Sequence, residues 1–391
     1  MDAPGSFTRA ELLEATGLSA PTIGSLTAHL IEMGLLIDLG TGPSSGGRRP
    51  SLMAFNARHG LVAGIALGPS HTRVAVADLQ GNIVDQVKVT TDVDRSPAKF
   101  LTHIAATVRT LVRRAEIPRA QLLAVGVGAP GAVDPDRGVL VGVAPNLPGW
   151  SKVPIAAVLQ RVLDAPILTE NDVNLAILGE RWRGAARGHG TCAFITVGTG
   201  IGAGILVNGE LHQGHHFLAG EIALMCMGPQ YAQTDFGVRG CFETLAGLKA
   251  VADRWVGHGG HTGDGWIAAL FAAAAGGDAD ARGIVDDTAR LIGIATANVS
   301  VVIDPSLVVL GGTLIVQAPM LLDEVTRIVA GIVPIPPRIV LSSLHEEAPL
   351  WGGLLLATQE AKTRLRRQLR GESPPVSAPG QAAIGRGAQI A

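Results

Sequence analysis

Two similar runs of residues constrain the fold of this chain more than any other feature of its sequence. The run LVAGIALGPSHTRVAVADLQGNIV, which begins at Leu61, alternates apolar strand-like stretches with turns that contain glycine. The run FITVGTGIGAGILVNGELHQG, which begins at Phe194, repeats this order of strand, turn and strand. Such a repeat predicts a duplicated α/β fold of two lobes with a cleft between them. Two unrelated hairpins, which are common in α/β chains, are the alternative.

The composition favours a folded chain in a reducing compartment. The 391 residues suffice for two or three domains, and the apolar share of 47% excludes a wholly disordered chain. Three cysteines (Cys192, Cys226 and Cys241) are too few for a disulfide scaffold. No signal peptide and no apolar run of membrane-spanning length is present, so we expect a cytoplasmic protein without a membrane partner. The net charge of −2 means that any DNA contact must come from a local patch.

The N-terminal segment has the signals of two short helices joined by a tight turn. Thr8 and Glu11 form a T-x-x-E capping box, and Gly17 is placed to end the helix that follows. Ser19 can cap a second helix, with Pro21 in its first turn, where a missing N–H matters little. This pattern predicts a helix-turn-helix, and a helical hairpin used only for protein contacts is the alternative.

The second helix and the segment after it carry the candidate DNA-contacting residues. Ile23, Leu26 and Leu30 recur at helical spacing and are expected to face a core. The residues on the other faces are free to enter a DNA groove: Thr22, Ser25 and His29. After Gly34, LLIDLG and PSLMAF flank TGPSSGGRR, which predicts a β-hairpin wing. Its arginines, Arg48 and Arg49, suit a phosphate or a narrow minor groove.

Two observations weigh against DNA binding by this module. Through residue 60, four basic residues (Arg9, Arg48, Arg49 and Arg58) stand against five acidic ones, so the module is not basic. A winged module also has another helix before the first one seen here, and only residues 1–6 precede it. We therefore expect that helix to be missing, or its place to be filled by another segment.

Several motifs in order resemble the ROK family (repressors, open reading frames and sugar kinases), in its repressor form. These motifs are GLSAPTIGSLTAHLIEMGLL, GGRRPSL, GVGAPGAVD, PNLPGW, ENDVN, VGTGIGAG, AGEI, GVRGCFE and DPSLVVLGG. The resemblance implies a duplicated actin/hexokinase-like (ribonuclease H-like) two-lobe α/β domain, with ATP and sugar sites in its cleft. It also implies a winged helix-turn-helix in front of that domain.

The chain accordingly divides into four expected regions. Residues 1–56 form the winged helix-turn-helix. Residues 61–172 together with residues 352–370 form the first lobe, and residues 173–351 form the second. Residues 371–391 are small, polar and rich in proline, which predicts a disordered tail.

The first lobe departs from the family's kinase pattern at its phosphate turn. Family kinases have Asp-x-Gly-Gly-Thr there, whereas this chain has Ala66-Leu67-Gly68-Pro69-Ser70. Ala66 cannot ligate a metal ion, and Pro69 has no N–H for a phosphate. Because phosphoryl transfer needs ATP and magnesium held together, we expect neither to be used as a cofactor.

Two other turns match the family's nucleotide site and are intact. They contain Gly198, Thr199, Gly200 and Gly202 in the second lobe, and Gly311 and Gly312 after SLVVL. Tight strand connections also need glycine, so these residues are interpreted as inherited scaffold, with nucleotide binding as the alternative.

The resemblance also implies a set of sugar-binding residues. Asp172 matches the family's catalytic base and, without a nucleotide, can accept hydrogen bonds from sugar hydroxyls; a cap for the helix that begins at Val173 is the alternative. The expected sugar-binding residues are Asn146, Asn171, Asp172, Glu221 and Glu243. Trp150 could stack on a sugar or belong to a core.

The family's zinc motif is largely absent. Its histidine and first two cysteines fall on Leu224, Thr234 and Phe236 here, and only Cys241 remains. Structural zinc needs four ligands, so no metal is expected, and Tyr231 and Phe236 are expected to hold the loop by packing.

These features predict a sugar-responsive transcriptional repressor that binds operator DNA as a homodimer or a dimer of dimers, and that has lost kinase activity. The alternatives are an active ATP-dependent sugar kinase with a relic DNA module, and a sensor that no longer binds DNA. The basic residues near the C-terminus form either a solvated face or a DNA contact: Lys362, Arg364, Arg366, Arg367 and Arg370.

Overall fold

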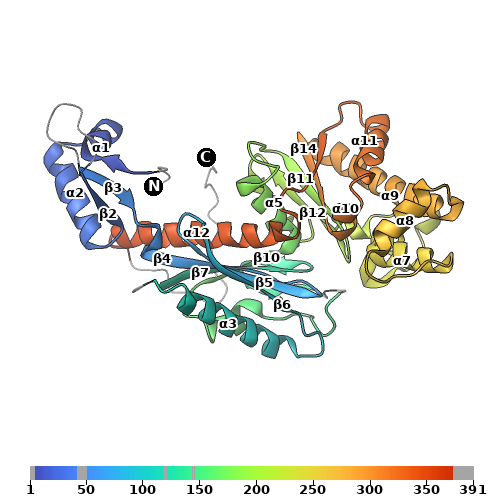
Figure 1. The fold of residues 1–391 in the computed structure, drawn as a ribbon, viewed down its shortest axis with the longest axis horizontal. Coiled ribbons are helices and arrows are strands. Elements are labelled where there is room, and N and C mark those ends of the chain that lie inside the picture. The colour runs from blue at the N-terminus through green and yellow to red at the C-terminus, as the bar shows by residue number, and fades with distance from the viewer. Residues whose placement is uncertain (1–4, 42–50, 118–120, 143, 145, 373–391) are drawn as a thin grey trace.

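A computed structural model describes the chain except for residues 1–4, 42–50, 118–120, 143, 145 and 373–391. Figure 1 shows a small N-terminal module, two lobes that each contain a sheet, and one long helix, α12 (Ala348–Leu369), which runs from the second lobe past the first lobe to the module. Within the described residues, no helix is long and apolar enough to cross a membrane.

The N-terminal module has the predicted pair of helices, α1 (Arg9–Thr16) and α2 (Ala20–Glu32). The capping box is confirmed, because the Glu11 amide donates to the Thr8 hydroxyl and the Thr8 amide donates to the Glu11 carboxylate. Gly17 ends α1 in the left-handed conformation with φ of 67°, and Ser19 caps α2. Local signals of capping and turn chemistry therefore set both helices.

A three-stranded sheet completes the module. Its order is β1 (Phe7–Thr8), β3 (Ser51–Phe55) and β2 (Leu36–Thr41), all antiparallel. Strand β1 directly precedes α1 and extends the sheet by pairing with β3, and the described residues before α1 contain no helix, as expected. The tip of the predicted wing, with Arg48 and Arg49, lies outside the described residues.

The predicted core face of α2 is wrong at one position. Ile23 is 4% exposed, as expected, but Leu26 is 47% exposed. Thr27 is buried instead, because its hydroxyl donates to the carbonyl of Ile23 at 2.8 Å and so needs no water. The apolar end of α2 lies nearer its C-terminus, at Leu30, where it packs against α12.

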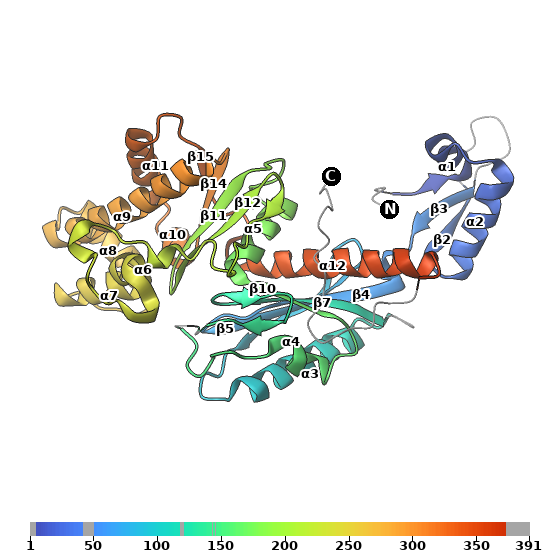
Figure 2. The ribbon, with the colours of Figure 1, turned by 180° about the vertical axis from the view of Figure 1, so that it is seen from behind.

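The first lobe contains a five-stranded sheet in the order β10-β7-β4-β5-β6. Strands β4 (Gly60–Ala66), β5 (His71–Asp78) and β6 (Ile83–Thr90) form an antiparallel meander, and β7 (Gln121–Ala129) and β10 (Ile167–Asn171) add in parallel to β4. Helices α3 (Pro97–Arg114) and α4 (Ile155–Gln160) cover one face of the sheet, and α12 covers the other (Figure 2). The hairpin of β8 (Val133–Asp134) and β9 (Val139–Leu140) follows β7.

The second lobe repeats this topology in the order β13-β12-β11-β14-β15. Strands β11 (Cys192–Val197), β12 (Ile201–Val207) and β13 (Glu210–Leu211) form the meander, and β14 (Leu307–Gly311) and β15 (Arg338–Leu341) add in parallel to β11. Helix α5 (Asp172–Arg183) covers one face. The helices on the other face are α6 (Gly240–Ala246), α7 (Leu248–Gly257), α8 (Trp266–Ala275), α9 (Ala279–Ile303), α10 (Thr313–Gln317) and α11 (Leu321–Ile332).

The duplication predicted from the two similar runs is confirmed. In each sheet the repeated run supplies the meander, and two later strands extend the sheet in parallel beside the first strand of that meander. The fold is therefore a duplicated, two-lobed α/β fold of the actin and hexokinase type, with a helix-turn-helix module in front of it.

Helix α12 holds the two lobes together through close backbone contacts. A Cβ atom on Gly352 would lie 2.0 Å from the carbonyl oxygen of Leu175 on α5. A Cβ atom on Gly126 of β7 would lie 2.0 Å from the carbonyl oxygen of Gly353. Side chains cannot be accommodated at these crossings, so glycine allows α12 to lie directly on α5 and on the first sheet.

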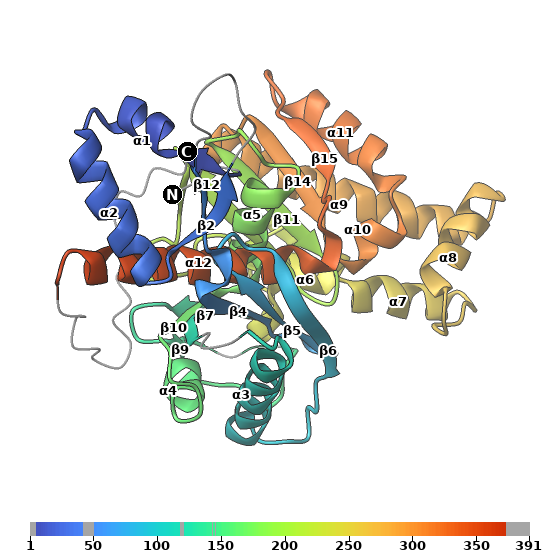
Figure 3. The same ribbon diagram turned by 60° about the vertical axis from the view of Figure 1, so that its left-hand side comes forward.

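The other end of α12 packs on the N-terminal module (Figure 3). Leu365 and Leu369 belong to one apolar cluster with residues from the end of α2 and the strands beside it: Leu30, Met33, Leu35 and Phe55. One helix therefore contacts both the element that begins at Asp172 and the module that carries the predicted DNA-contacting residues.

Candidate carbohydrate site and DNA-facing module

Three carboxylates gather where the two lobes meet. Asp172 is the first residue of α5, Glu221 precedes the 3₁₀ turn Ile222–Leu224, and Glu243 lies on α6. Burial, and to a lesser extent the negative charge of Glu221, raise the pKa of Asp172 to about 7 against the hydrogen bond from the Val173 amide. Burial and the charge of Glu243 also raise the pKa of Glu221. The three groups thus form one electrostatically coupled cluster, which we call the carboxylate cluster.

Glu243 has a carboxylate oxygen without a partner. The side chain is only 7% exposed, and its Oε2 atom accepts a hydrogen bond of 3.0 Å from the Ile201 amide. Its Oε1 atom is buried and has no hydrogen-bond partner among the described residues. Burial raises the pKa of this carboxyl as well, against the favourable bond from Ile201. A buried acceptor of this kind is costly unless a ligand supplies a donor.

Asn171, which was expected to bind sugar, caps helix α5 in the structure. The N-cap of α5 is Asn171, whose side-chain oxygen accepts from the amides of Val173 (2.9 Å) and Asn174 (3.0 Å). The side-chain amide of Asn171 donates to the carbonyl of Gly131 at 3.0 Å and faces Asp172 Oδ1 at 3.3 Å. Asn171 is therefore the N-cap and is engaged by the protein, while Asp172 also accepts a hydrogen bond of 3.0 Å from the Val173 amide through its Oδ1 atom.

Sequence reasoning did not single out Glu170, which holds the first turn of α5 through hydrogen bonds to Asn171 and Asn174. Glu170 is buried at the end of β10 and accepts hydrogen bonds from the Asn171 amide (2.7 Å) and the Asn174 side chain (2.9 Å). Burial raises its pKa against these bonds. Its second oxygen accepts from Gln213, which follows β13. The spacing of four residues between Glu170 and Asn174 could have indicated their hydrogen bond. The bond from Gln213 had no such signal, because Gln213 is distant in the sequence.

The glycine turn of the second lobe reaches across to the first. Its Thr199 carbonyl accepts a hydrogen bond of 3.3 Å from the side chain of Asn146. A Cβ atom on Gly200 would lie 3.4 Å from that Asn146 nitrogen and 3.5 Å from Glu243 Oε2. The structure thus brings Asn146, the turn and the carboxylate cluster to one place.

Packing accounts for the other glycines of the predicted nucleotide turns. A Cβ atom added to Gly198 would lie 3.1 Å from the Thr313 amide nitrogen, and one added to Gly202 would lie 3.2 Å from the Val173 side chain. A Cβ atom added to Gly311 would lie 2.4 Å from the Phe194 ring, and one added to Gly312 would lie 2.5 Å from the Val197 carbonyl oxygen. These contacts give a physical basis for interpreting the glycines as inherited scaffold, with nucleotide binding as the alternative.

The phosphate turn of the first lobe is closed by its own hydrogen bonds. The Leu67 amide donates to the Gly128 carbonyl at 2.9 Å, and Pro69 has no amide hydrogen. Thr91 donates from its hydroxyl to the Gly68 carbonyl at 2.8 Å and from its amide to the Ser70 carbonyl at 2.9 Å. The turn therefore has no carboxylate for magnesium, and neither the engaged Leu67 amide nor Pro69 can donate a hydrogen bond to a phosphate, so it departs from a phosphate loop at three of its five residues.

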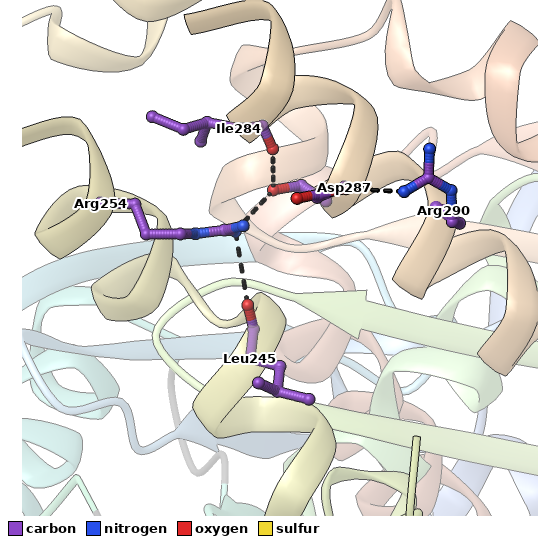
Figure 4. Close-up of polar contacts among 6 residues, drawn as sticks. Leu245, Arg254, Ile284, Asp287 and Arg290 are labelled. Carbon is purple, nitrogen blue, oxygen red and sulfur yellow. Dashed lines mark hydrogen bonds and ion pairs between the residues drawn. The ribbon is translucent and has the colours of Figure 1, made fainter. Parts of the chain in front are cut away.

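Arg254 on α7 is hydrogen-bonded to the end of α6 and to α9 (Figure 4). Its guanidinium donates to the carbonyl of Leu245 at 3.4 Å and to the hydroxyl of Thr288 on α9 at 3.0 Å. Thr288 in turn donates to the Ile284 carbonyl at 2.7 Å. Burial lowers the pKa of Arg254, and Asp287 opposes that effect. This chain of bonds fixes the helix that carries Glu243.

The residues at the positions of the family's zinc motif do not form a metal site. Leu224 and Thr234 are exposed, and with Phe236 they offer no ligand set for zinc. The described part of the chain contains no group of three or more His, Cys, Asp or Glu side chains that could hold a metal. Tyr231 and Phe236 pack edge to face with ring centroids 5.9 Å apart, as predicted. All three cysteines are free.

Trp150 belongs to the core of the first lobe. It is 2% exposed and packs edge to face on Phe100, with ring centroids 6.3 Å apart. Of the two roles considered for it, the structure supports core packing.

The candidate DNA-contacting residues of α2 share one exposed face. Thr22, Ser25 and His29 are all exposed, and their spacing of three and four residues places them in a row. His29 also lies 4.0 Å from Glu32. This row is available to a groove-binding role, whereas the predicted partners Arg48 and Arg49 lie outside the described residues.

The fold and the carboxylate cluster define a class: two-lobed α/β proteins of the actin and hexokinase type that carry an N-terminal helix-turn-helix. The sequence pattern of the ROK family matches residues 62–360. The chain belongs to the ROK family, as the motifs indicated.

Individual ROK proteins resemble the chain to different extents. The xylose repressor of Caldicellulosiruptor bescii is 25% identical, over 83% of this chain and 83% of that protein. The glucokinase of Halalkalibacterium halodurans is 32% identical, over 64% of this chain and 79% of that protein. The crystal structure of a ROK family transcriptional regulator, a homologue of the E. coli MLC protein, matches with a TM-score of 0.72 and 22% identity, over 91% of this chain and 92% of that one.

Proposed function

We propose that the protein is a transcriptional repressor that binds operator DNA as a dimer and responds to an aldose sugar without phosphorylating it. In this proposal α2 reads a DNA groove, the carboxylate cluster binds the sugar, and α12 couples the two. The observation that carries the sugar site is the buried, unpartnered Oε1 atom of Glu243. DNA as the target places the protein in the cytoplasm.

The donor and acceptor balance of the site suits a polyhydroxyl ligand. Asp172, Glu221 and Glu243 supply acceptors, which a sugar can satisfy with several hydroxyl donors on one ring. The exposed Leu224 takes the position of a polar family residue, which favours a ligand with fewer polar groups. The relatives include xylose repressors and glucokinases, so D-xylose and D-glucose are the first sugars to test.

The closed phosphate turn is the reason for proposing that catalysis is absent. Phosphoryl transfer depends on positioning the triphosphate and neutralising its charge, which requires hydrogen-bond donors and a metal ion. The turn at Ala66 to Ser70 has no carboxylate for the metal ion, and its Leu67 amide and Pro69 offer no donor to the triphosphate. The repressor relative also aligns over 83% of the chain, against 64% for the glucokinase.

The contacts of α12 give the sugar a route to the DNA module. A ligand changes DNA affinity only by preferring one arrangement of the lobes over another. α12 lies on α5 near Leu175, three residues from Asp172, and its other end packs on Leu35 of the module. A change in the angle between the lobes would therefore displace the module.

A mobility-shift experiment tests the proposed function. The purified protein should retard the DNA upstream of its own gene and leave a random-sequence duplex of equal length free. D-xylose or another aldose should weaken the complex by roughly tenfold or more, a typical coupling between two sites. The triple variant Thr22→Ala/Ser25→Ala/His29→Ala should abolish the specific shift while the sugar still raises the melting temperature. No specific shift with or without sugars would instead identify a sensor without DNA binding.

An active sugar kinase is the second candidate, and one observation favours it. A pKa of about 7 suits Asp172 to remove a proton from a sugar hydroxyl at neutral pH. The glucokinase relative is consistent with such a role. The two candidates differ in whether ATP is consumed when sugar is present.

A further inference from the structure

The C-terminal half of α12 carries a row of basic side chains. Lys362, Arg366 and Arg370 follow one another at intervals of four residues, so they lie on one face of the helix. We call them the basic stripe. It extends along the helix axis for about 12 Å. Arg366 and Arg370 are exposed.

The basic stripe borders the contact between α12 and the N-terminal module. Each member directly follows a residue of the apolar seam: Ala361, Leu365 and Leu369. The seam packs on the end of α2 through Leu30 and Met33. Figures 1 and 2 both show the C-terminal end of α12 against the end of α2. The stripe therefore lies beside the residues of α12 that pack on the module, which also carries Thr22, Ser25 and His29.

The charge at the exposed end of the stripe, at Arg366 and Arg370, is largely uncompensated. Arg364, on a different face, is paired with Glu360 at 2.9 Å. Arg370 lies 3.9 Å from Glu372, and both side chains are more than half exposed, so this pair is weak. Arg366 has no ionic or hydrogen-bonded partner for its guanidinium in the part of the chain that the structure describes. At least one full positive charge therefore points to solvent beside the module.

The module itself lacks the charge that DNA binding requires. Binding to a duplex depends on neutralising phosphates, which present one negative charge for about every 1.7 Å of helix axis. Through residue 60 the chain has more acidic than basic residues, and Thr22 and Ser25 of the reading row are uncharged. Beyond Arg48 and Arg49 of the predicted wing, the basic stripe is an adjacent element that can supply further positive charge.

We propose that the basic stripe is a second DNA contact, which binds the phosphate backbone beside the groove read by α2. This inference rests on the proposed DNA-binding function and extends it to a surface outside the winged module. α2 has 13 residues, so about 20 Å separate its first turn from the end that meets α12. A duplex presents about 12 phosphates over that length, so one bound duplex can engage both elements.

The test is the salt dependence of DNA binding. Fluorescence anisotropy would be measured between about 50 and 200 mM salt, with the upstream fragment and with a random duplex of equal length. The variant Arg366→Gln/Arg370→Gln removes two stripe charges and keeps good helix formers. Each lost phosphate contact lowers the slope of log K against log salt by about 0.9, so the double variant should lose about 1.8. The loss should be equal for both duplexes, because phosphate contacts carry no sequence information.

A matched control separates a local contact from an effect of net charge. Arg109→Gln/Arg113→Gln removes two exposed arginines from α3, which covers the face of the first sheet opposite to α12. Its slope should equal that of the wild type. An unchanged slope in the stripe variant, or an equal loss in the α3 variant, would overturn the stripe as a DNA contact. An unaltered melting temperature would show that the stripe variant is folded.

The outcomes distinguish this inference from the proposed function. If the wild type prefers the upstream fragment but the stripe variant keeps its slope, the repressor proposal stands and the stripe proposal fails. If the wild type shows no preference, the repressor proposal fails, and the slope on the random duplex still decides the role of the stripe. If the wild type binds neither duplex, both proposals fail.

Discussion

The Gly352→Ala variant should lose roughly 3 kcal/mol of folding free energy or fail to accumulate as a folded protein. An added Cβ atom would lie 2.0 Å from the Leu175 carbonyl oxygen, a distance that no side-chain rearrangement can relieve. Moving α12 away is also blocked, because Gly353 contacts Gly126 on the first sheet. Alanine favours a helix intrinsically by about 1 kcal/mol, but this gain is smaller than the overlap it causes.

A control at another helical glycine should change stability in the opposite direction. Gly283 lies on α9, and a Cβ atom there would have no neighbour within 4 Å. Gly283→Ala should therefore raise stability by about 0.5–1 kcal/mol. Urea midpoints followed by circular dichroism would measure both variants against the wild type. A Gly352→Ala protein as stable as the wild type would contradict the close crossing of α12 and α5.

Affinity for the sugar should fall roughly 100-fold between pH 8 and pH 5. The pKa of Asp172 is raised to about 7, so its carboxyl is mostly ionised at pH 8 and mostly protonated at pH 5. Sugar hydroxyls donate to the ionised carboxylate, so below pH 7 a proton must leave before the sugar binds. Each pH unit below 7 then lowers the apparent affinity about tenfold.

Isothermal titration with D-xylose, or with whichever aldose raises the melting temperature, would measure this dependence. The Asp172→Asn variant should bind more weakly at pH 8, and its affinity should vary much less with pH. The exposed Asp164→Asn variant should keep the steep dependence of the wild type. A wild-type affinity that is constant from pH 5 to pH 8 would show that Asp172 does not accept from the sugar in its ionised form.

The parts of the fold that the sequence predicted are those with local signals. The caps at Thr8 and Ser19 work through hydrogen bonds to residues within three positions, so the pattern alone identified them. The repeated meanders were recognisable because each consists of adjacent strands joined by short turns. Motif order then located the carboxylates of the two lobes.

The parts that escaped prediction depend on partners distant in the sequence. The short strand β1 was not predicted, because its pairing partner β3 lies more than 40 residues later in the sequence. The buried Thr27 and exposed Leu26 are a local exception, because the hydrogen bond from the Thr27 hydroxyl to Ile23 is not visible in the spacing of apolar residues. Glu180 is a further buried carboxylate that no local pattern marked. It accepts hydrogen bonds from Ser342, Ser343 and Leu344, and so ties α5 to the segment before α12.

The central claim is that the carboxylate cluster binds a carbohydrate without transferring phosphate to it. A coupled assay of ADP release, with magnesium, ATP and a panel that includes D-xylose and D-glucose, tests this most directly. We expect no sugar-dependent ADP release above the background of the Asp172→Asn variant, at sugar concentrations that do raise the melting temperature. Steady turnover with one of the sugars, abolished by Asp172→Asn, would contradict it and identify the protein as a kinase.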